Sequence, residues 1–191
     1  MFRKIRRKEK QLTIEECKRV LLLAEYGTLS TMGDDGYPYG VPVNYVFHNG
    51  NVYFHCATVG HKLENIHKNS NVSFNVVTDV RVVPLIPGED FNESDVKLNG
   101  FDTNFNSVII FGKASEVFEE EKMDGLGAFL ENFLNENDYK KYKKAGIKYI
   151  EKSLKRTKLI KIDIVHMTGK RGIRTNKEIQ GKGKTKGSVV H

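Results

Sequence analysis

The chain has 191 residues, of which 39% are hydrophobic and 29% are charged, and its formal net charge is +7. This length suits one domain with its own core, and no stretch approaches the ~18 consecutive apolar residues of a membrane-spanning helix. Cys17 and Cys56 are too few for a disulfide framework, so the composition excludes a small disulfide-rich secreted domain. "MFRKIRRKEK" leads into a polar helix start rather than an apolar run, so we expect no signal peptide and a cytoplasmic protein.

The positive charge is concentrated at the two ends of the chain. Residues 1–10 carry six Lys/Arg and one Glu (+5), and residues 169–191 carry seven Lys/Arg and one Glu (+6), which leaves 7 − 11 = −4 for the middle. A nucleic-acid-binding face would spread basic residues over the folded part, so nucleic acid is not the expected partner. We expect one domain over residues 1–174 and a flexible basic tail over 175–191.

The first predicted element is a helix in "QLTIEECKRVLLLAEYG". Thr13 and Glu16 form a capping-box pattern, apolar residues recur at helical spacing, and Gly27 stands where a C-terminal cap belongs.

Strand patterns follow the helix. "GTLSTM", "YPYGVPVNYVFH" and "NVYFHCA" are rich in aromatic and β-branched residues, "GDDG" predicts a turn, and Asn49-Gly50 is a strong hairpin signal. Pro42 indicates an edge or bulged position. A short helix over 61–68 and the strand "NVSFNVVTD" come next. These elements predict a mainly β fold, an antiparallel barrel with flanking helices.

The second half begins with a long connection over residues 80–104, a length typical of functional or mobile loops. "FNSVIIFGKASEVF" is the longest predicted strand, with Gly112 at a bulge or bend. Helices are predicted over about 119–134 and 138–154, the second with a solvated Lys face, and "LIKIDIVHM" alternates like a final strand.

The corner "VYFHCATVGHKLENI" (residues 52–66) carries the strongest local chemical signal. A strand ends at His55, the chain turns at Gly60, and a helix begins near His61 and Lys62. Basic residues in a first helical turn oppose the helix dipole, so an anion supplied from elsewhere, such as a phosphate group, would satisfy them and the free N–H groups. The competing interpretation is an ordinary solvated helix start.

The histidines of this region invite a metal interpretation, which we disfavour. His55, His61 and His67 recur every six residues, whereas zinc ligands on one element use tighter spacing. Cys56 follows His55 but faces the other side of a strand, so we expect a small buried apolar residue rather than a nucleophile paired with histidine.

Several segments, taken together and in order, resemble the nitroimidazole-resistance (Nim) family within the FMN-binding split-barrel superfamily around pyridoxamine 5'-phosphate oxidase. They are "IRRKEKQLTIEECKRVLLLAEYGTLS", "GYPYGVPVNY", "YFHCATVGHK", "FNSVIIFGKA" and "TGK". The resemblance covers roughly residues 3–170. It implies a homodimer of six-stranded antiparallel split β-barrels, with two FMN sites at the interface.

The resemblance also implies roles for individual residues. His55 would be the catalytic residue beside the flavin, and His61 and Lys62 would hold its phosphate. Further cofactor contacts would come from the following residues: Thr28, Leu29, Ser30, Val41, Pro42, Val43, Asn44, Cys56, Ala57, Met167 and Lys170 of one chain, and Thr103, Asn104, Asn106 and Ser107 of the partner chain. The sequence departs from the family in "NGFDTNFN" and in the long acidic stretch 86–104, both over the expected substrate face.

The implied function is an FMN-dependent oxidoreductase that reduces a small acceptor, such as a nitroimidazole or another nitro-aromatic compound. No Gly-rich dinucleotide fingerprint is present, so NAD(P)H would bind transiently as the reductant. Two alternatives stay open. One is a haem-binding split barrel with His166 or His191 as axial ligand, and the other is a non-enzymatic flavin- or polyanion-binding module that uses the basic ends.

Overall fold

The computed structural model describes residues 2–82 and 103–172. Its elements in chain order are η1 (Lys8–Lys10), α1 (Ile14–Leu23), β1 (Tyr26–Met32), β2 (Pro38–Asn44), β3 (Val46–His48), β4 (Asn51–Cys56), α2 (His61–Lys68), β5 (Asn71–Val82), β6 (Thr103–Val117), α4 (Glu119–Phe133), α5 (Glu136–Ser153), η2 (Leu154–Arg156) and β7 (Lys158–Arg171). In these residues, no helix combines the length and the apolar character needed to cross a membrane.

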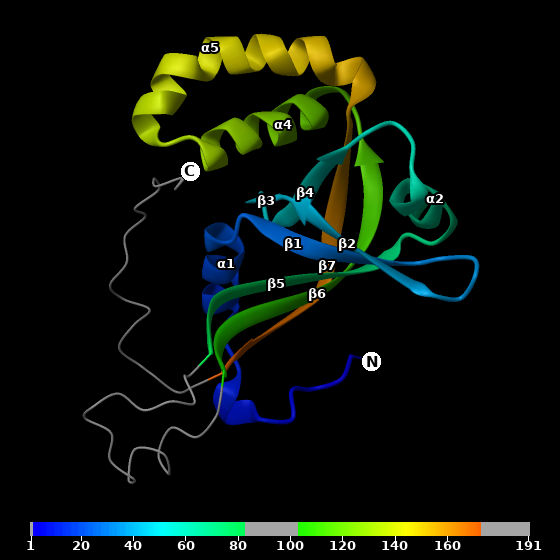
Figure 1. Cartoon of the computed structure of the whole chain (residues 1–191), viewed down its shortest axis with the longest axis vertical. Helices are drawn as coiled ribbons and strands as arrows, with labels where there is room; N and C mark the ends of the chain where they lie inside the picture. The colour runs from blue at the N-terminus through cyan, green and yellow to red at the C-terminus, as the bar shows by residue number, and fades with distance from the viewer. Residues whose placement is uncertain (1, 83–102, 173–191) are drawn as a thin grey trace.

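All described strands belong to one antiparallel sheet in the order β2-β1-β5-β6-β7-β4-β3. The sheet curls into a half-barrel, with α1 on its concave side and the α4–α5 pair above one end (Figure 1). The mainly β fold with flanking helices therefore agrees with the prediction. Because the edge strands β2 and β3 are not paired with one another, the barrel is split.

The predicted strand number is wrong, because the described sheet has seven strands rather than six. The expected single strand "YPYGVPVNYVFH" divides at Tyr45 into β2 and β3. The Tyr45 side chain is fully buried, and its hydroxyl donates a hydrogen bond of 2.7 Å to the carbonyl oxygen of Leu21 in α1. This inward turn interrupts the ladder, so β2 pairs with β1 and β3 pairs with β4.

The N-terminal helix forms as predicted at its start but not at its end. Both arms of the capping box are present: Glu16 N donates to the Thr13 side chain, and Thr13 N donates to the Glu16 carboxylate. The helix ends at Leu23, so Gly27 is not its cap. Gly27 lies in β1, where a Cβ atom would sit 2.4 Å from the Phe74 ring of the neighbouring strand β5. This position needs glycine because a larger residue would clash with that ring.

Two other local signals are confirmed. Asn49 and Gly50 both have positive φ, 48° and 78°, as a tight β3–β4 hairpin requires. The β6–β7 register shifts between Phe111 and Gly112, which is the predicted irregularity in the longest strand. Helices α2, α4 and α5 also match their predicted positions.

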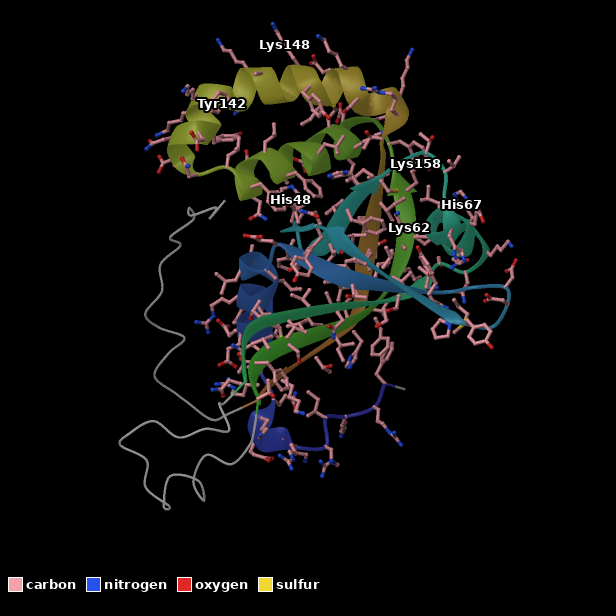
Figure 2. All side chains as sticks on the ribbon, in the orientation of Figure 1. His48, Lys62, His67, Tyr142, Lys148 and Lys158 are labelled. Carbon is pink, nitrogen blue, oxygen red and sulfur yellow. The ribbon has the colours of Figure 1, made fainter. Side chains whose placement is uncertain are left out.

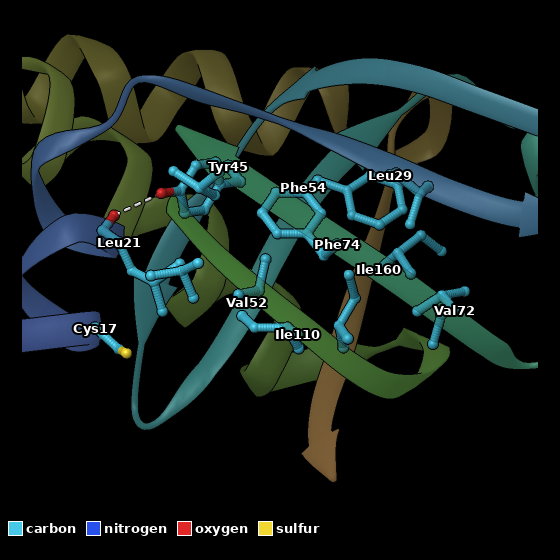
Figure 3. Close-up of a cluster of buried hydrophobic side chains, with 14 of the residues drawn as sticks. Cys17, Leu21, Leu29, Tyr45, Val52, Phe54, Val72, Phe74, Ile110 and Ile160 are labelled. Carbon is cyan, nitrogen blue, oxygen red and sulfur yellow. Dashed lines mark hydrogen bonds between the residues drawn. The ribbon is translucent and has the colours of Figure 1, made fainter. Parts of the chain in front are cut away.

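The barrel encloses the main apolar core, and a second cluster lies under α4. The side chains of Leu29, Tyr45, Phe54, Phe74 and Ile110 are fully buried inside the barrel (Figure 3). The second cluster joins α4 to β4 and β7 through Tyr53, Leu126, Phe129 and Leu159.

Two glycines bring α4 close to its neighbours. A Cβ atom on Gly125 would lie 2.5 Å from Leu159 Cδ2, so glycine lets α4 approach the sheet. A Cβ atom on Gly146 of α5 would lie 2.6 Å from Leu130 Cδ1, so α5 approaches α4 in the same way. These contacts fix the position of α4 over the split side of the barrel.

Two predicted segments lie wholly or mostly outside the described residues. Of the connection 80–104, residues 80–82 end β5 and residues 103 and 104 begin β6. The rest of it, and the tail 175–191, are not described.

We predict opposite effects for two alanine substitutions in α4. Gly125→Ala should lower the free energy of unfolding by about 1 kcal/mol, because overpacking against buried Leu159 outweighs the gain in helix propensity. Gly127 has no atom within 4 Å of its Cβ position, so Gly127→Ala should raise this energy by about 0.5–1 kcal/mol. Urea unfolding followed by circular dichroism measures both, and equal effects would contradict the close α4–sheet contact.

Candidate functional site

A pocket of about 680 Å³ opens between the edge strand β2 and strand β4, beneath α4. Its lining residues come from four segments of the chain: Pro42, Val43, Asn44, His55, Cys56, Ala57, Lys62, Phe129, Leu130, Phe133 and Leu134. The volume is within the range of small-molecule sites. The split between β2 and β4 therefore creates a hollow that a ligand could enter.

The corner at the start of α2 places a cation in this pocket. The helix begins after Gly60, whose φ of 138° favours glycine, and no side chain caps its first turn. Lys62 lines the pocket, whereas the His61 ring lies 4.2 Å from the Tyr39 ring (centroid to centroid) at the edge of β2. The ammonium group of Lys62 and the positive end of the helix dipole thus lie at one end of the pocket.

Figure 2 shows Lys62 beside the central sheet and His67 further along α2. Lys68, near the end of the same helix, pairs with Asp34 in the β1–β2 turn and does not line the pocket. The two lysines of this helix thus have different surroundings, and only Lys62 faces the hollow.

His55 lies at the end of β4 on the side covered by α4. Its ring meets the Phe129 ring edge-on, with centroids 4.9 Å apart and an interplanar angle of 67°. His55 keeps more than a third of its surface exposed, and partial burial beside Phe129 lowers its pKa, because the imidazolium ion loses some hydration there. The imidazole is therefore neutral at pH 7, with one nitrogen able to donate a hydrogen bond and the other able to accept one.

Cys56 packs on the opposite side of β4 from His55, as predicted. Its half-buried side chain rests against the barrel core and also borders the pocket. Burial raises the pKa of Cys56, and the nearby Lys62 and Lys158 oppose this effect. The thiol form therefore prevails, which suits packing rather than nucleophilic attack.

The predicted contacts in β1 and β2 are neighbours in the sheet. Thr28 pairs with Pro42, and Ser30 pairs with Gly40, on the outer face. The neighbouring Leu29 and Val41 point inward, Leu29 into the core and Val41 against it. Any contact of these two residues with a ligand outside the barrel would have to use their main-chain atoms.

A second group of predicted residues lies where β6 begins and β7 ends, and none of them lines the pocket. Ser107 pairs with Lys170 and donates a hydrogen bond of 3.4 Å to its carbonyl oxygen. Asn106 donates to Asp79, and the Lys170 ammonium lies over the Phe105 ring. The remaining members are Thr103 and Asn104, the first two residues of β6, and Met167, which packs against the barrel core.

The fourth wall of the pocket was not predicted from the sequence. Phe129, Leu130 and Phe133 come from the last turns of α4, and Leu134 is its C-cap. The rings of Phe129 and Phe133 are nearly parallel, with centroids 5.9 Å apart. The spacing i, i+1, i+4, i+5 in "FLENFL" was the available signal. It has the same form as an ordinary core-facing stripe, so it could not identify a pocket.

His166, the candidate haem ligand, lies outside the pocket. Its ring stacks on Phe2, with centroids 4.5 Å apart, and more distantly on Phe111. In the part of the chain that the structure describes, no three His, Cys, Asp or Glu side chains are grouped to hold a metal ion. His191 lies outside the described residues.

The comparisons with known proteins agree with this architecture. The family model for pyridoxamine 5'-phosphate oxidase matches residues 13–171. A candidate 5-nitroimidazole antibiotic resistance protein from Bacteroides thetaiotaomicron is 19% identical, with 85% of this chain and 86% of that chain covered and a TM-score of 0.63. A comparison with curated proteins gave no match.

Two further solved structures share the fold. An FAD- and haem-binding protein from Mycobacterium smegmatis is 17% identical, with 92% of this chain and 81% of that chain covered and a TM-score of 0.63. The flavocytochrome Anf3 from Azotobacter vinelandii is 15% identical, with coverage of 98% and 85% and a TM-score of 0.65. At these identities, the likeness shows the fold alone.

We predict that the lowered pKa of His55 makes stability fall on acidification. Below pH 6.5 the unfolded chain binds a proton at this position that the folded chain resists, so the free energy of unfolding falls as the pH drops from 6.5 toward the folded pKa. His55→Gln should reduce this slope and leave the pH dependence above 7 unchanged. Urea unfolding between pH 5 and 8 tests this, and identical slopes in both proteins would contradict it.

Proposed function

The chain belongs to the pyridoxamine 5'-phosphate oxidase family, and we propose that it is a Nim-like oxidoreductase that binds FMN. The proposed reaction passes electrons from NAD(P)H or another reductant to a small acceptor, such as a nitroimidazole or another nitro-aromatic compound. One observation carries the proposal: the pocket brings together seven residues expected to contact the cofactor, from three segments of the chain. They are Pro42, Val43, Asn44, His55, Cys56, Ala57 and Lys62.

The residues of the pocket fit the chemistry of a flavin phosphate. Lys62 and the open first turn of α2 provide positive charge for the phosphate group, and no carboxylate is among the described lining residues. Strand β2 is an edge strand, so its outer side can offer main-chain groups to a ring system. The apolar side chains of Val43 and Phe129 suit a flat heterocycle.

Bound FMN would supply the electron-transfer chemistry, and the protein would bind and orient it. In this proposal Lys62 holds the phosphate, Cys56 and Ala57 lie along the ribityl chain, and residues 42–44 lie beside the ring. His55, neutral at pH 7, would exchange a hydrogen bond with the flavin or acceptor through a ring nitrogen. Helix α4, which covers one side of the pocket, would limit the access of water to the bound flavin.

We also propose a homodimer with the flavin at its interface. Pro42, Thr28, Asn75, Ile109 and Thr168 are successive partners across β2, β1, β5, β6 and β7, which places them in one row on the outer face of the sheet. In this region Val77, Ile109 and Phe111 are exposed, an apolar surface of the kind that a partner covers.

The second group of predicted residues fits such a dimer. Because Ser107 lies outside the pocket of its own chain, it would serve the flavin site of the partner, as the resemblance implies. Lys170, expected to contact the flavin of its own chain, pairs with Ser107 outside that pocket.

Haem binding is less well supported than flavin binding. His166 stacks on Phe2, which in turn stacks on Phe111, and His166 does not line the pocket, so it is not placed to bind the iron of a haem there. The Mycobacterium smegmatis relative binds haem as well as FAD, but its likeness to this chain extends only to the fold.

We predict that Lys62→Gln weakens FMN binding by about 10- to 100-fold, because a charge-assisted contact to phosphate is lost. Riboflavin lacks the phosphate, so its affinity should not change in the same variant. Lys68→Gln is the matched control, since Lys68 belongs to the same helix but pairs with Asp34. Quenching of flavin fluorescence gives the dissociation constants, and the absence of flavin absorbance near 450 nm after loading the wild type would reject the proposal itself.

We predict that the wild type sediments as a dimer of about 44 kDa, twice the chain mass of 21.8 kDa. Ile109→Glu should shift it to the monomer and weaken FMN binding, because it puts a charge on the proposed interface. Phe118→Glu, at an exposed residue preceding α4, is the control and should do neither. A monomeric wild type in analytical ultracentrifugation would reject the dimer.

A further inference from the structure

The end of α4 forms a wall of the pocket in which the flavin proposal uses Phe129 and leaves Phe133 without a contact. Phe129 is largely buried in the cluster under α4, but Phe133 keeps 38% of its surface exposed. The two rings stack with an inclination of only 15°, so Phe129 supports the Phe133 ring in its place at the pocket. Phe133 therefore offers a face to a ligand and is only a minor part of the protein core.

Lys62 and His55, which line the pocket outside the α4 wall, determine which ligand charge the pocket accepts. Lys62 is the one side chain with a full charge at pH 7 among the described lining residues, and it is positive. His55, edge-on to Phe129, has a lowered pKa and is neutral. In the flavin-free pocket a cationic ligand would meet Lys62 with no carboxylate to pair with, whereas a neutral or anionic ligand would not be repelled. A phosphate group bound to Lys62 would remove this charge preference.

The wall is held in place before any ligand binds. Gly125 lets α4 contact the sheet closely, and Gly146 lets α5 contact Leu130 next to Phe129. A wall that is already ordered loses little conformational freedom on binding, which favours recognition by shape.

We propose that Phe133, supported by Phe129, is the specificity-determining surface for a planar aromatic acceptor. The acceptor would stack on Phe133 and form a hydrogen bond with the imidazole of His55. Its role as an electron acceptor rests on the proposed function, but the binding surface does not depend on it.

Three probes of similar size test the wall: 4-nitrobenzyl alcohol (neutral), 4-nitrobenzoate (anionic) and 4-nitrobenzyltrimethylammonium (cationic). Calorimetric titration should show that the FMN-loaded full chain binds the neutral probe. The flavin-free full chain should bind the cationic probe at least tenfold more weakly than the neutral and anionic probes. Phe133→Ala should weaken the neutral probe about three- to tenfold, the range expected for one aromatic stacking contact. The affinity of Phe133→Leu for the neutral probe should lie between those of the wild type and Phe133→Ala, because leucine keeps apolar area but lacks the ring.

Phe118→Ala is the matched control, since Phe118 is an exposed phenylalanine that precedes the same helix and lies outside the pocket. Melting curves of all variants establish that they fold. Unchanged affinity for the neutral probe in Phe133→Ala, or equal binding of the cationic and neutral probes by the flavin-free chain, would overturn the inference.

The same experiment separates this inference from the flavin proposal. Absorbance near 450 nm is measured first, and failure of the wild type to take up FMN rejects the flavin site. The titrations are then made on the flavin-free protein. A loss of affinity in the Phe133 variants but not in Phe118→Ala would still support the aromatic wall, and no loss would reject it as well.

Discussion

The position of the pocket depends on one buried hydrogen bond. Tyr45 is fully enclosed by the core, with its ring edge-on to Phe74, so its hydroxyl must find a partner inside the protein. It donates to the main chain of Leu21 at the end of α1. Because this bond turns Tyr45 inward, the chain leaves one edge of the sheet and continues at the other. The opening between β2 and β4 is the direct result.

The signals that predicted the fold correctly are those with purely local causes. Thr13 and Glu16 exchange hydrogen bonds within a four-residue capping box, and the Asn49-Gly50 turn needs only the positive φ angles of its own two residues. The features that were missed have distant causes. The break at Tyr45 depends on Leu21, 24 residues earlier, and Gly27 is required by Phe74 in the neighbouring strand. Neither partner is visible in the local pattern.

The candidate site also has a part that local sequence predicted and a part that it did not. The strand–turn–helix corner with Lys62 was predicted from local charge and helix geometry, and the structure places it in the pocket. The wall formed by α4 was not predicted, because an apolar stripe that faces a pocket has the same spacing as one that faces a core. The residues Ser107 and Lys170 could be linked to a cofactor only through the family resemblance, since they are far along the sheet from the pocket of their own chain.

The stacking of Phe2 on His166 has a practical consequence for handling the protein. Phe2 and the exposed ring of Phe111 lie together on the outer face of β6 and β7, beside the row that contains Ile109. An affinity tag or fusion partner joined directly before residue 2 would therefore emerge at the surface through which two copies are proposed to associate. A long spacer at this end would keep a fused domain from competing with that association.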